Sequence, residues 1–142
     1  AAAKVAAIAK DHPEAYVLAA DTVVACGRRI MPKAETSDDA RAFLKLLSGR
    51  RHRVIGGVSI FAPGGASSAR VVETAVTFKR LSSAELDYYL ASDEWQDKAG
   101  AYAIQGLAAR FVRSLNGSYS NVVGLPLFET SQMLSGLGFD LT

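Results

Sequence analysis

Two apolar segments decide the fold, Val54–Phe61 (VIGGVSIF) and Val71–Phe78 (VVETAVTF), joined by a loop that contains Pro63-Gly64-Gly65. In the second segment, Val72, Thr74, Val76 and Phe78 alternate with the residues between them. A period of two is typical of a half-buried strand, and Pro-Gly-Gly is typical of a turn. We therefore predict that the two segments form a β-hairpin.

Helices are expected on both sides of this hairpin. Residues 1–10 show a helical pattern that His12-Pro13 ends, since proline disfavours helix in the residue before it. Three more helices are predicted. The first begins at a Ser37 cap and ends at Gly49. The second begins at a capping box formed by Ser82 and Glu85, and the third follows Pro126 and ends at Gly138.

Further strands are predicted from short apolar runs, with a tight turn at Asn116-Gly117. These runs are Tyr16–Ala20 leading into Asp21, Ala101–Ile104, Ala108–Leu115, and Tyr119–Val123. After Asp21, Val23 and Val24 are expected to continue extended as far as a turn at Gly27. Strands mixed with helices in this order indicate an α/β or α+β fold around a mixed sheet.

Composition limits the classes of function. The sequence has 142 residues, of which 49% are hydrophobic, and this suits a single domain over residues 1–142. A net charge of +2 gives no reason to expect nucleic acid as a partner, and no apolar run reaches the roughly 20 residues of a membrane span. Cys26 is the single cysteine, so no internal disulfide forms and a cytoplasmic location is expected, with Cys26 a small buried hydrophobe.

The candidate site consists of carboxylate, ammonium and amide groups. Asp21 follows an apolar strand, where a carboxylate either binds a divalent metal and orients water or makes a turn hydrogen bond. Lys33 and Lys4 either neutralise phosphate charge or lie in solvent. Gln105 either reads the edge of a nucleobase or is a buried structural amide. Two histidines exclude a histidine-rich metal site, and His52 is interpreted as a structural or surface residue.

Five motifs in this order resemble the Maf family of nucleotide pyrophosphatases, and the resemblance covers essentially the whole sequence. They are Ala19–Val24 (AADTVV), Pro32-Lys33, Leu47–Val54 (LSGRRHRV), Asp97–Gly106 (DKAGAYAIQG) and Gly117–Pro126 (GSYSNVVGLP). The resemblance implies a mixed, elongated central sheet with two lobes around a nucleotide cleft, as in the related inosine-triphosphate pyrophosphatases. The two later motifs favour Maf over that group.

The resemblance also implies a reaction and a set of site residues. The reaction is hydrolysis of a nucleoside triphosphate to the monophosphate and pyrophosphate with Mg²⁺ or Mn²⁺. Asp21 matches the catalytic, metal-binding carboxylate, Lys4 and Lys33 match the phosphate-binding lysines, and Gln105 matches a glutamine near the base. The residues around Gln105, Tyr102–Gly106 (YAIQG), are similar to those of the family branch that acts on dTTP and UTP. A homodimer is expected because the family often forms one.

One family feature is not found in the sequence. Maf proteins begin with a strand and an S-x-S-P-R-R loop that holds the triphosphate, followed by a further acidic residue. We expect these parts to lie outside the 142 residues. The alternatives are a truncated inactive copy and a non-catalytic nucleotide-binding regulator of cell division, which relates to the family's link with septum formation.

Overall fold

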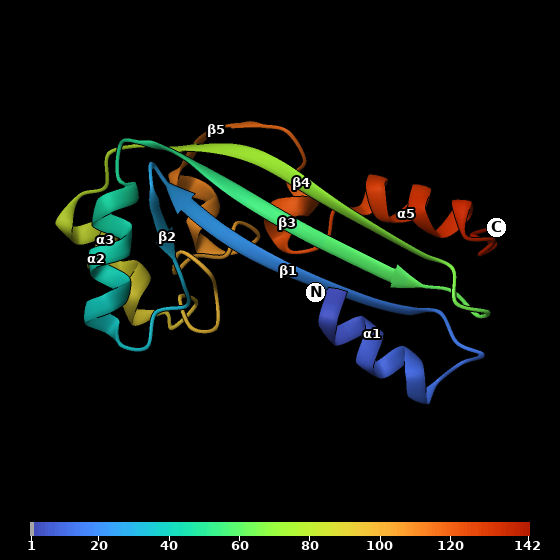
Figure 1. The fold of residues 1–142 in the computed structure, drawn as a ribbon. Coiled ribbons are helices and arrows are strands. Elements are labelled where there is room, and N and C mark those ends of the chain that lie inside the picture. The colour runs from blue at the N-terminus through green and yellow to red at the C-terminus, as the bar shows by residue number, and fades with distance from the viewer. Residues whose placement is uncertain (1) are drawn as a thin grey trace.

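The computed structural model describes residues 2–142 and shows one five-stranded sheet in the order β2-β1-β3-β4-β5 (Figure 1). The strands are β1 (Val17–Cys26), β2 (Arg29–Met31), β3 (Arg51–Phe61), β4 (Ser67–Phe78) and β5 (Val112–Asn116). The α/β fold class and the elongated sheet are confirmed. All four pairings are antiparallel, so the parallel pairing expected in a mixed sheet does not occur within residues 2–142.

The predicted hairpin is confirmed as β3 and β4, paired from Arg51 opposite Thr77 to Phe61 opposite Ser67. Its turn uses Gly64 at φ 91° and Gly65 at φ 99°, a backbone region that side chains with a Cβ disfavour. Both strands begin a few residues earlier than predicted, because cross-strand hydrogen bonds extend the pairing into polar residues.

Strand β1 runs through Asp21 without a break. The predicted strand covered Tyr16–Ala20, with Val23 and Val24 continuing extended as far as a turn at Gly27, and β1 is one strand that pairs with β3 from Val17 to Ala25 and ends at Cys26, just before Gly27. Asp21 lies opposite Gly57 in mid-strand, so its interpretation as a strand-end residue is wrong. Beyond it, Val24 belongs to the core, and its burial keeps the backbone extended.

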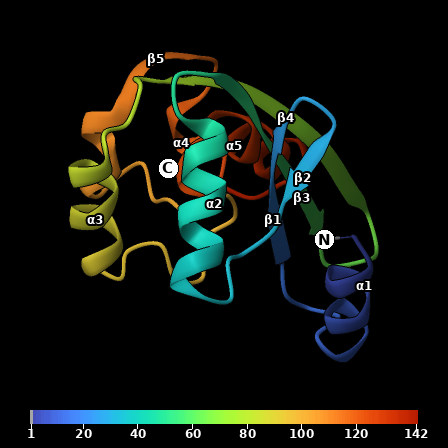
Figure 2. The same cartoon turned by 90° about the vertical axis from the view of Figure 1, so that its left-hand side faces the viewer.

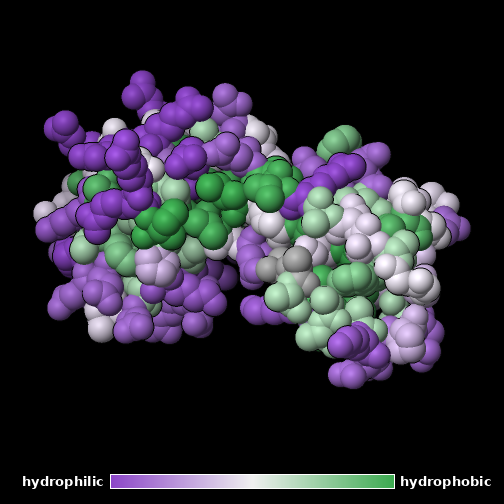
Figure 3. All heavy atoms as spheres, in the orientation of Figure 1, coloured by the Kyte–Doolittle hydropathy of each residue, from purple (hydrophilic) through white to green (hydrophobic). Residues whose placement is uncertain are grey.

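The helices lie toward the two ends of the sheet and over its middle. At one end are α2 (Ser37–Leu47) and α3 (Ser83–Ala91), and at the other is α5 (Leu127–Gly136) (Figure 1). Helix α4 (Tyr119–Val123) contacts β3 and β4 between them. Helix α1 (Ala2–Asp11) packs against β1 and β3, on the side of the sheet away from α2 and α3 (Figure 2). In the space-filling view the molecule narrows between two lobes (Figure 3).

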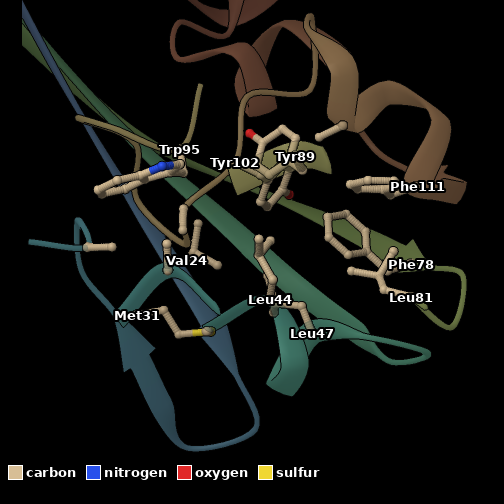
Figure 4. Close-up of a cluster of buried hydrophobic side chains, with 14 of the residues drawn as sticks. Val24, Met31, Leu44, Leu47, Phe78, Leu81, Tyr89, Trp95, Tyr102 and Phe111 are labelled. Carbon is tan, nitrogen blue, oxygen red and sulfur yellow. The ribbon is translucent and has the colours of Figure 1, made fainter. Parts of the chain in front are cut away.

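Each lobe has its own hydrophobic core. The larger core joins the sheet to α2 and α3, and Figure 4 shows Leu44 and Leu47 facing the strand residues Val24 and Phe78. The smaller core packs Val58 and Ile60 of β3 against Met133 of α5. Val54, on the same face of β3, belongs to the larger core. One face of β3 therefore contributes residues to both cores, and the middle of the sheet lies between the two lobes.

The predicted helix ends are mostly confirmed. Ser82 and Glu85 form the reciprocal hydrogen bonds of a capping box at α3. Helix α2 is capped by Thr36, not by Ser37, since the Thr36 side chain accepts from the Asp39 amide. Cys26 is buried as expected.

Two predicted strands in the last third are wrong. Residues 101–104 turn, with Ala101 at φ 67°, and a 3-10 helix (η1, Leu107–Phe111) precedes β5. The segment Tyr119–Val123 is α4, because the Ser118 side chain accepts from the Asn121 amide and caps a helix there. The Asn116-Gly117 turn therefore joins a strand to a helix, not to a second strand.

Candidate functional site

A cleft of about 280 Å³ lies between the two lobes on the sheet. It is bordered by mid-strand residues of β1, by Lys33 after β2, by the segment from Asp97 to Gln105, and by Val122 and Val123 of α4. Strand β2 pairs only with Val24–Cys26, so no strand within residues 2–142 pairs with the outer edge of β1 beside Asp21. Residues that are far apart in the sequence thus meet at one opening.

Three of the four predicted site residues border this cleft. They are Asp21, Lys33 and Gln105. The Gln105 side chain is exposed, so its interpretation as a buried structural amide is wrong. Lys4 does not border the cleft, but its Nζ lies 3.9 Å from Oδ1 of Asp21; the Lys4 side chain is largely exposed and that of Asp21 about half exposed. The structure therefore places one carboxylate, two ammonium groups and one amide in the same region.

Lys33 is held in place by the segment opposite it. Lys33 and Ala99 form an isolated antiparallel bridge, and the Gly100 amide donates to the carbonyl of Met31. Gly100 has φ +71°, and a Cβ there would lie 2.9 Å from a methyl group of Val24. Glycine at this position lets the DKAG segment press onto β1, which brings Lys98 and Asp97 to the cleft beside Lys33.

Asn121 anchors the floor of the cleft, a role that the sequence analysis missed. Its buried amide nitrogen donates to the carbonyls of Val54 and Val72 and to the Thr74 hydroxyl, each at 3.1 Å. Its Oδ1 lies against Gly56 of β3, where a Cβ would be only 2.0 Å away. These contacts fix α4, and with it Val122 and Val123, to the sheet. The pairing of a strand glycine with a distant asparagine leaves no signal in a single sequence.

A buried polar pair supports the cleft wall. His52 Nε2 lies 2.6 Å from the hydroxyl of Tyr102, a residue that borders the cleft. Burial lowers the pKa of His52 to about 4 and raises the pKa of Tyr102, so both groups are neutral at pH 7. Of the two interpretations of His52, structural or surface, the structure supports the first, since His52 is buried against Phe78 and Tyr102.

The match to known proteins agrees with this geometry. The model of the Maf family, described as Maf-like protein, matches residues 1–137. The chain belongs to the Maf family. A dTTP/UTP pyrophosphatase of Paramagnetospirillum magneticum is 66% identical over 139 residues, covering 98% of this chain and 73% of that protein.

Two further relatives carry the same name. A dTTP/UTP pyrophosphatase of Rhodospirillum rubrum is 60% identical, covering 98% of this chain and 66% of its own length. One of Granulibacter bethesdensis is 62% identical, covering 87% of this chain and 58% of its own length. The chain therefore spans roughly two thirds of the length of these curated relatives.

The donor groups of this Maf cleft suit a metal that is bound mainly by substrate and water. Within residues 2–142 no group of three or more His, Cys, Asp or Glu side chains could hold a metal by itself. The cleft offers the carboxylates of Asp21 and Asp97. Mg²⁺ is usually bound by one or two carboxylates together with substrate phosphates and water, so the residues present fit such an ion. Among the described helices none is long and apolar enough to cross a membrane.

Proposed function

We propose that this chain forms the catalytic part of a nucleoside triphosphate pyrophosphatase that acts on dTTP and UTP. The reaction consumes one water and yields the nucleoside monophosphate and pyrophosphate. One observation carries the proposal: Asp21, Lys33 and Gln105, from three separate segments, border one cleft. The relatives' activity supports the same reaction, since proteins 60–66% identical over 139 residues are dTTP/UTP pyrophosphatases.

Phosphate binding is assigned to the lysines. A triphosphate gains charge on its leaving pyrophosphate as the bond between the α- and β-phosphates breaks. Lys33 on the cleft border and Lys4 beside Asp21 supply positive charge at that end. Fixed ammonium groups stabilise such developing charge, and no covalent intermediate is needed.

Asp21 is assigned the carboxylate role in catalysis. Its side chain is about half exposed and lies 3.9 Å from Lys4, so the carboxylate is accessible and stays ionised at pH 7. It would orient the water that attacks the α-phosphorus and, with Asp97, would hold a divalent ion such as Mg²⁺ or Mn²⁺. A bound ion of this kind supplies charge neutralisation and orientation of phosphate oxygens.

Gln105 is assigned to the base. Its exposed amide offers one acceptor and two donors, which match the donor and acceptor groups on the edge of uracil or thymine. Lys33 and Gln105 come from different segments of the cleft border, so phosphate and base are assigned to separate parts of one opening. This arrangement supports a nucleotide substrate over free pyrophosphate.

The test is pyrophosphate release by the full-length protein from dTTP, UTP, dCTP, ATP and GTP with Mg²⁺ or Mn²⁺. We expect release from dTTP and UTP, and its loss in Asp21→Asn with an unchanged circular dichroism spectrum. Asp87→Asn is the matched control, because Asp87 is an exposed carboxylate on α3 paired with Arg41 outside the cleft. Full activity in Asp21→Asn would overturn the role of Asp21.

The non-catalytic alternative predicts a different outcome of the same assay. A nucleotide-binding regulator would bind dTTP or UTP without releasing pyrophosphate. The cytoplasmic location, the homodimer, the single domain and the position of the S-x-S-P-R-R loop outside this sequence stay predictions. Gel filtration with light scattering tests the homodimer directly.

A further inference from the structure

The backbone on both sides of Gln105 is held by two side chains from another part of the chain. The hydroxyl of Tyr89, on α3, accepts a hydrogen bond from the Ala103 amide at 3.2 Å. The Oε1 atom of Glu94, just after α3, accepts one from the Leu107 amide at 2.9 Å. These two amides lie two residues before and two residues after Gln105, so both flanks of the glutamine are tied to one element.

Gly106 shows how closely Glu94 approaches this turn. A Cβ on Gly106 would lie 1.9 Å from Oε1 of Glu94, a distance that real side chains do not reach. The Gly106 amide in turn donates to the Ala103 carbonyl at 3.1 Å. The segment from Ala103 to Leu107 is therefore a closed turn with a carboxylate seated against its glycine, and Gln105 projects from it into solvent at the cleft.

Tyr89 and the backbone that carries Glu94 are held at α3. Tyr89 is fully buried, with its ring 5.7 Å from that of Phe111. Burial raises the pKa of Tyr89 to about 12, so the hydroxyl stays protonated at neutral pH. The Glu94 amide donates to the Ser92 hydroxyl at 3.2 Å, and the indole nitrogen of Trp95 donates to the carbonyl of Leu90 at 3.2 Å. Both acceptors thus come from α3 and the segment hydrogen-bonded to its end.

We propose that Tyr89 and Glu94 are positioning residues that set the nucleotide selectivity by fixing the backbone around Gln105. The inference rests on the proposed function, since it gives Gln105 the base. Ordering a mobile loop on binding costs backbone conformational entropy, and a backbone that is already fixed avoids that cost. The hydrogen bonds from the Ala103 and Leu107 amides to Tyr89 and Glu94 fix the backbone on both sides of Gln105.

The experiment compares Glu94→Ala, Glu94→Gln, Tyr89→Phe and Gln105→Ala in the full-length protein, measuring kcat and KM for dTTP and for GTP. Glu94→Ala and Tyr89→Phe should lower the ratio of kcat/KM for dTTP to kcat/KM for GTP by about tenfold, mainly by raising KM for dTTP. About tenfold is the loss expected when one hydrogen-bonding group is misplaced. Glu94→Gln keeps an oxygen that accepts from Leu107 and should retain the preference. Gln105→Ala should lose it.

Two matched controls separate positioning from general destabilisation. Tyr88→Phe removes a neighbouring exposed hydroxyl on the same helix, and Glu73→Ala removes an exposed carboxylate on β4. Neither side chain borders the cleft, so both should keep the wild-type preference. Amide hydrogen exchange provides a readout without turnover, and the Leu107 amide should lose protection in Glu94→Ala but not in Glu94→Gln.

The outcomes distinguish this inference from the proposed function. If dTTP is cleaved and Gln105→Ala loses the preference while Glu94→Ala and Tyr89→Phe keep it, the positioning role is overturned and the activity stands. If Gln105→Ala keeps the preference, the base role and the inference both fail although pyrophosphate is released. Absence of pyrophosphate release from every nucleotide overturns the proposed function, and unchanged Leu107 exchange in Glu94→Ala then overturns the positioning role independently.

Discussion

The contact between Gly56 and Asn121 predicts a specific coupling in stability. A methyl group at position 56 would lie 2.0 Å from Oδ1 of Asn121, so Gly56→Ala must displace the amide or the strand. Overpacking of this kind costs about 1–3 kcal/mol of unfolding free energy. Asn121→Ala removes the amide protons that serve Val54, Val72 and Thr74. Each buried acceptor left unsatisfied costs about 1–3 kcal/mol, so this variant should lose about 3 kcal/mol.

The two effects should not add. In the double variant the methyl group added at position 56 occupies space that the missing amide has vacated, so the overpacking cost disappears. We expect a coupling free energy of about 2 kcal/mol that makes the double variant more stable than the sum of the single ones predicts. Gly57→Ala is the matched control, since a Cβ there meets no heavy atom within 4 Å and should change stability by less than about 0.5 kcal/mol.

The assay is urea unfolding of the wild-type protein, the two single variants, the double variant and the control, followed by circular dichroism and by the fluorescence of Trp95, the single tryptophan. A two-state fit for each protein gives its free energy of unfolding, and the coupling free energy of the double-mutant cycle follows from these values. Additivity within about 0.5 kcal/mol would refute the reasoning, because it would mean that Gly56 and Asn121 do not share the space. Equal losses for Gly56→Ala and Gly57→Ala would refute it as well.

Three further predictions concern pH, packing and phosphate binding. Burial lowers the pKa of His52 to about 4 in the folded protein, against 6.5 in the unfolded chain, so neutral His52 stabilises the fold above pH 6.5 and this stability is lost as the pH falls toward 4. In His52→Gln the urea midpoint should therefore depend less on pH between 6.5 and 4 than in the wild-type protein. Gly100→Ala should cost about 2 kcal/mol, measured by thermal unfolding, because its φ is +71° and Val24 blocks a Cβ. Lys33→Met should lower kcat/KM for dTTP about a hundredfold, whereas Lys45→Met on α2 should not.

Local patterns predicted the elements whose residues follow one rule throughout. The β3–β4 hairpin was predictable because apolar and β-branched residues in both segments, alternation in the second and the Pro-Gly-Gly turn between them all indicate paired strands. The capping box of α3 was predictable because Ser82 and Glu85 interact over three residues. The family resemblance likewise depends on short motifs in a fixed order, and the match over residues 1–137 confirms it.

Predictions failed where a distant contact overrides local preference. Val122 and Val123 suggested a strand, but Ser118 caps a helix and Asn121 binds the sheet from it. Asp21 was expected at a strand end, but pairing with β3 carries β1 beyond it, to Cys26. The register of β1 is decided by pairing with a distant strand, whereas α4 combines the local Ser118 cap, which the sequence analysis missed, with the distant contacts of Asn121 on the sheet.

The sequence by itself determined the fold class, the hairpin at its centre, the helices around it and the family, because these depend on periodicity and on short contiguous motifs. Only the tertiary structure decided that Asp21, Lys33 and Gln105 border one cleft and that Lys4 of α1 lies beside Asp21. It also revealed the supports of that cleft, Asn121 on Gly56 and Glu94 on Gly106. Such contacts depend on strand register and close packing between distant segments, and neither property is encoded in any local stretch of residues.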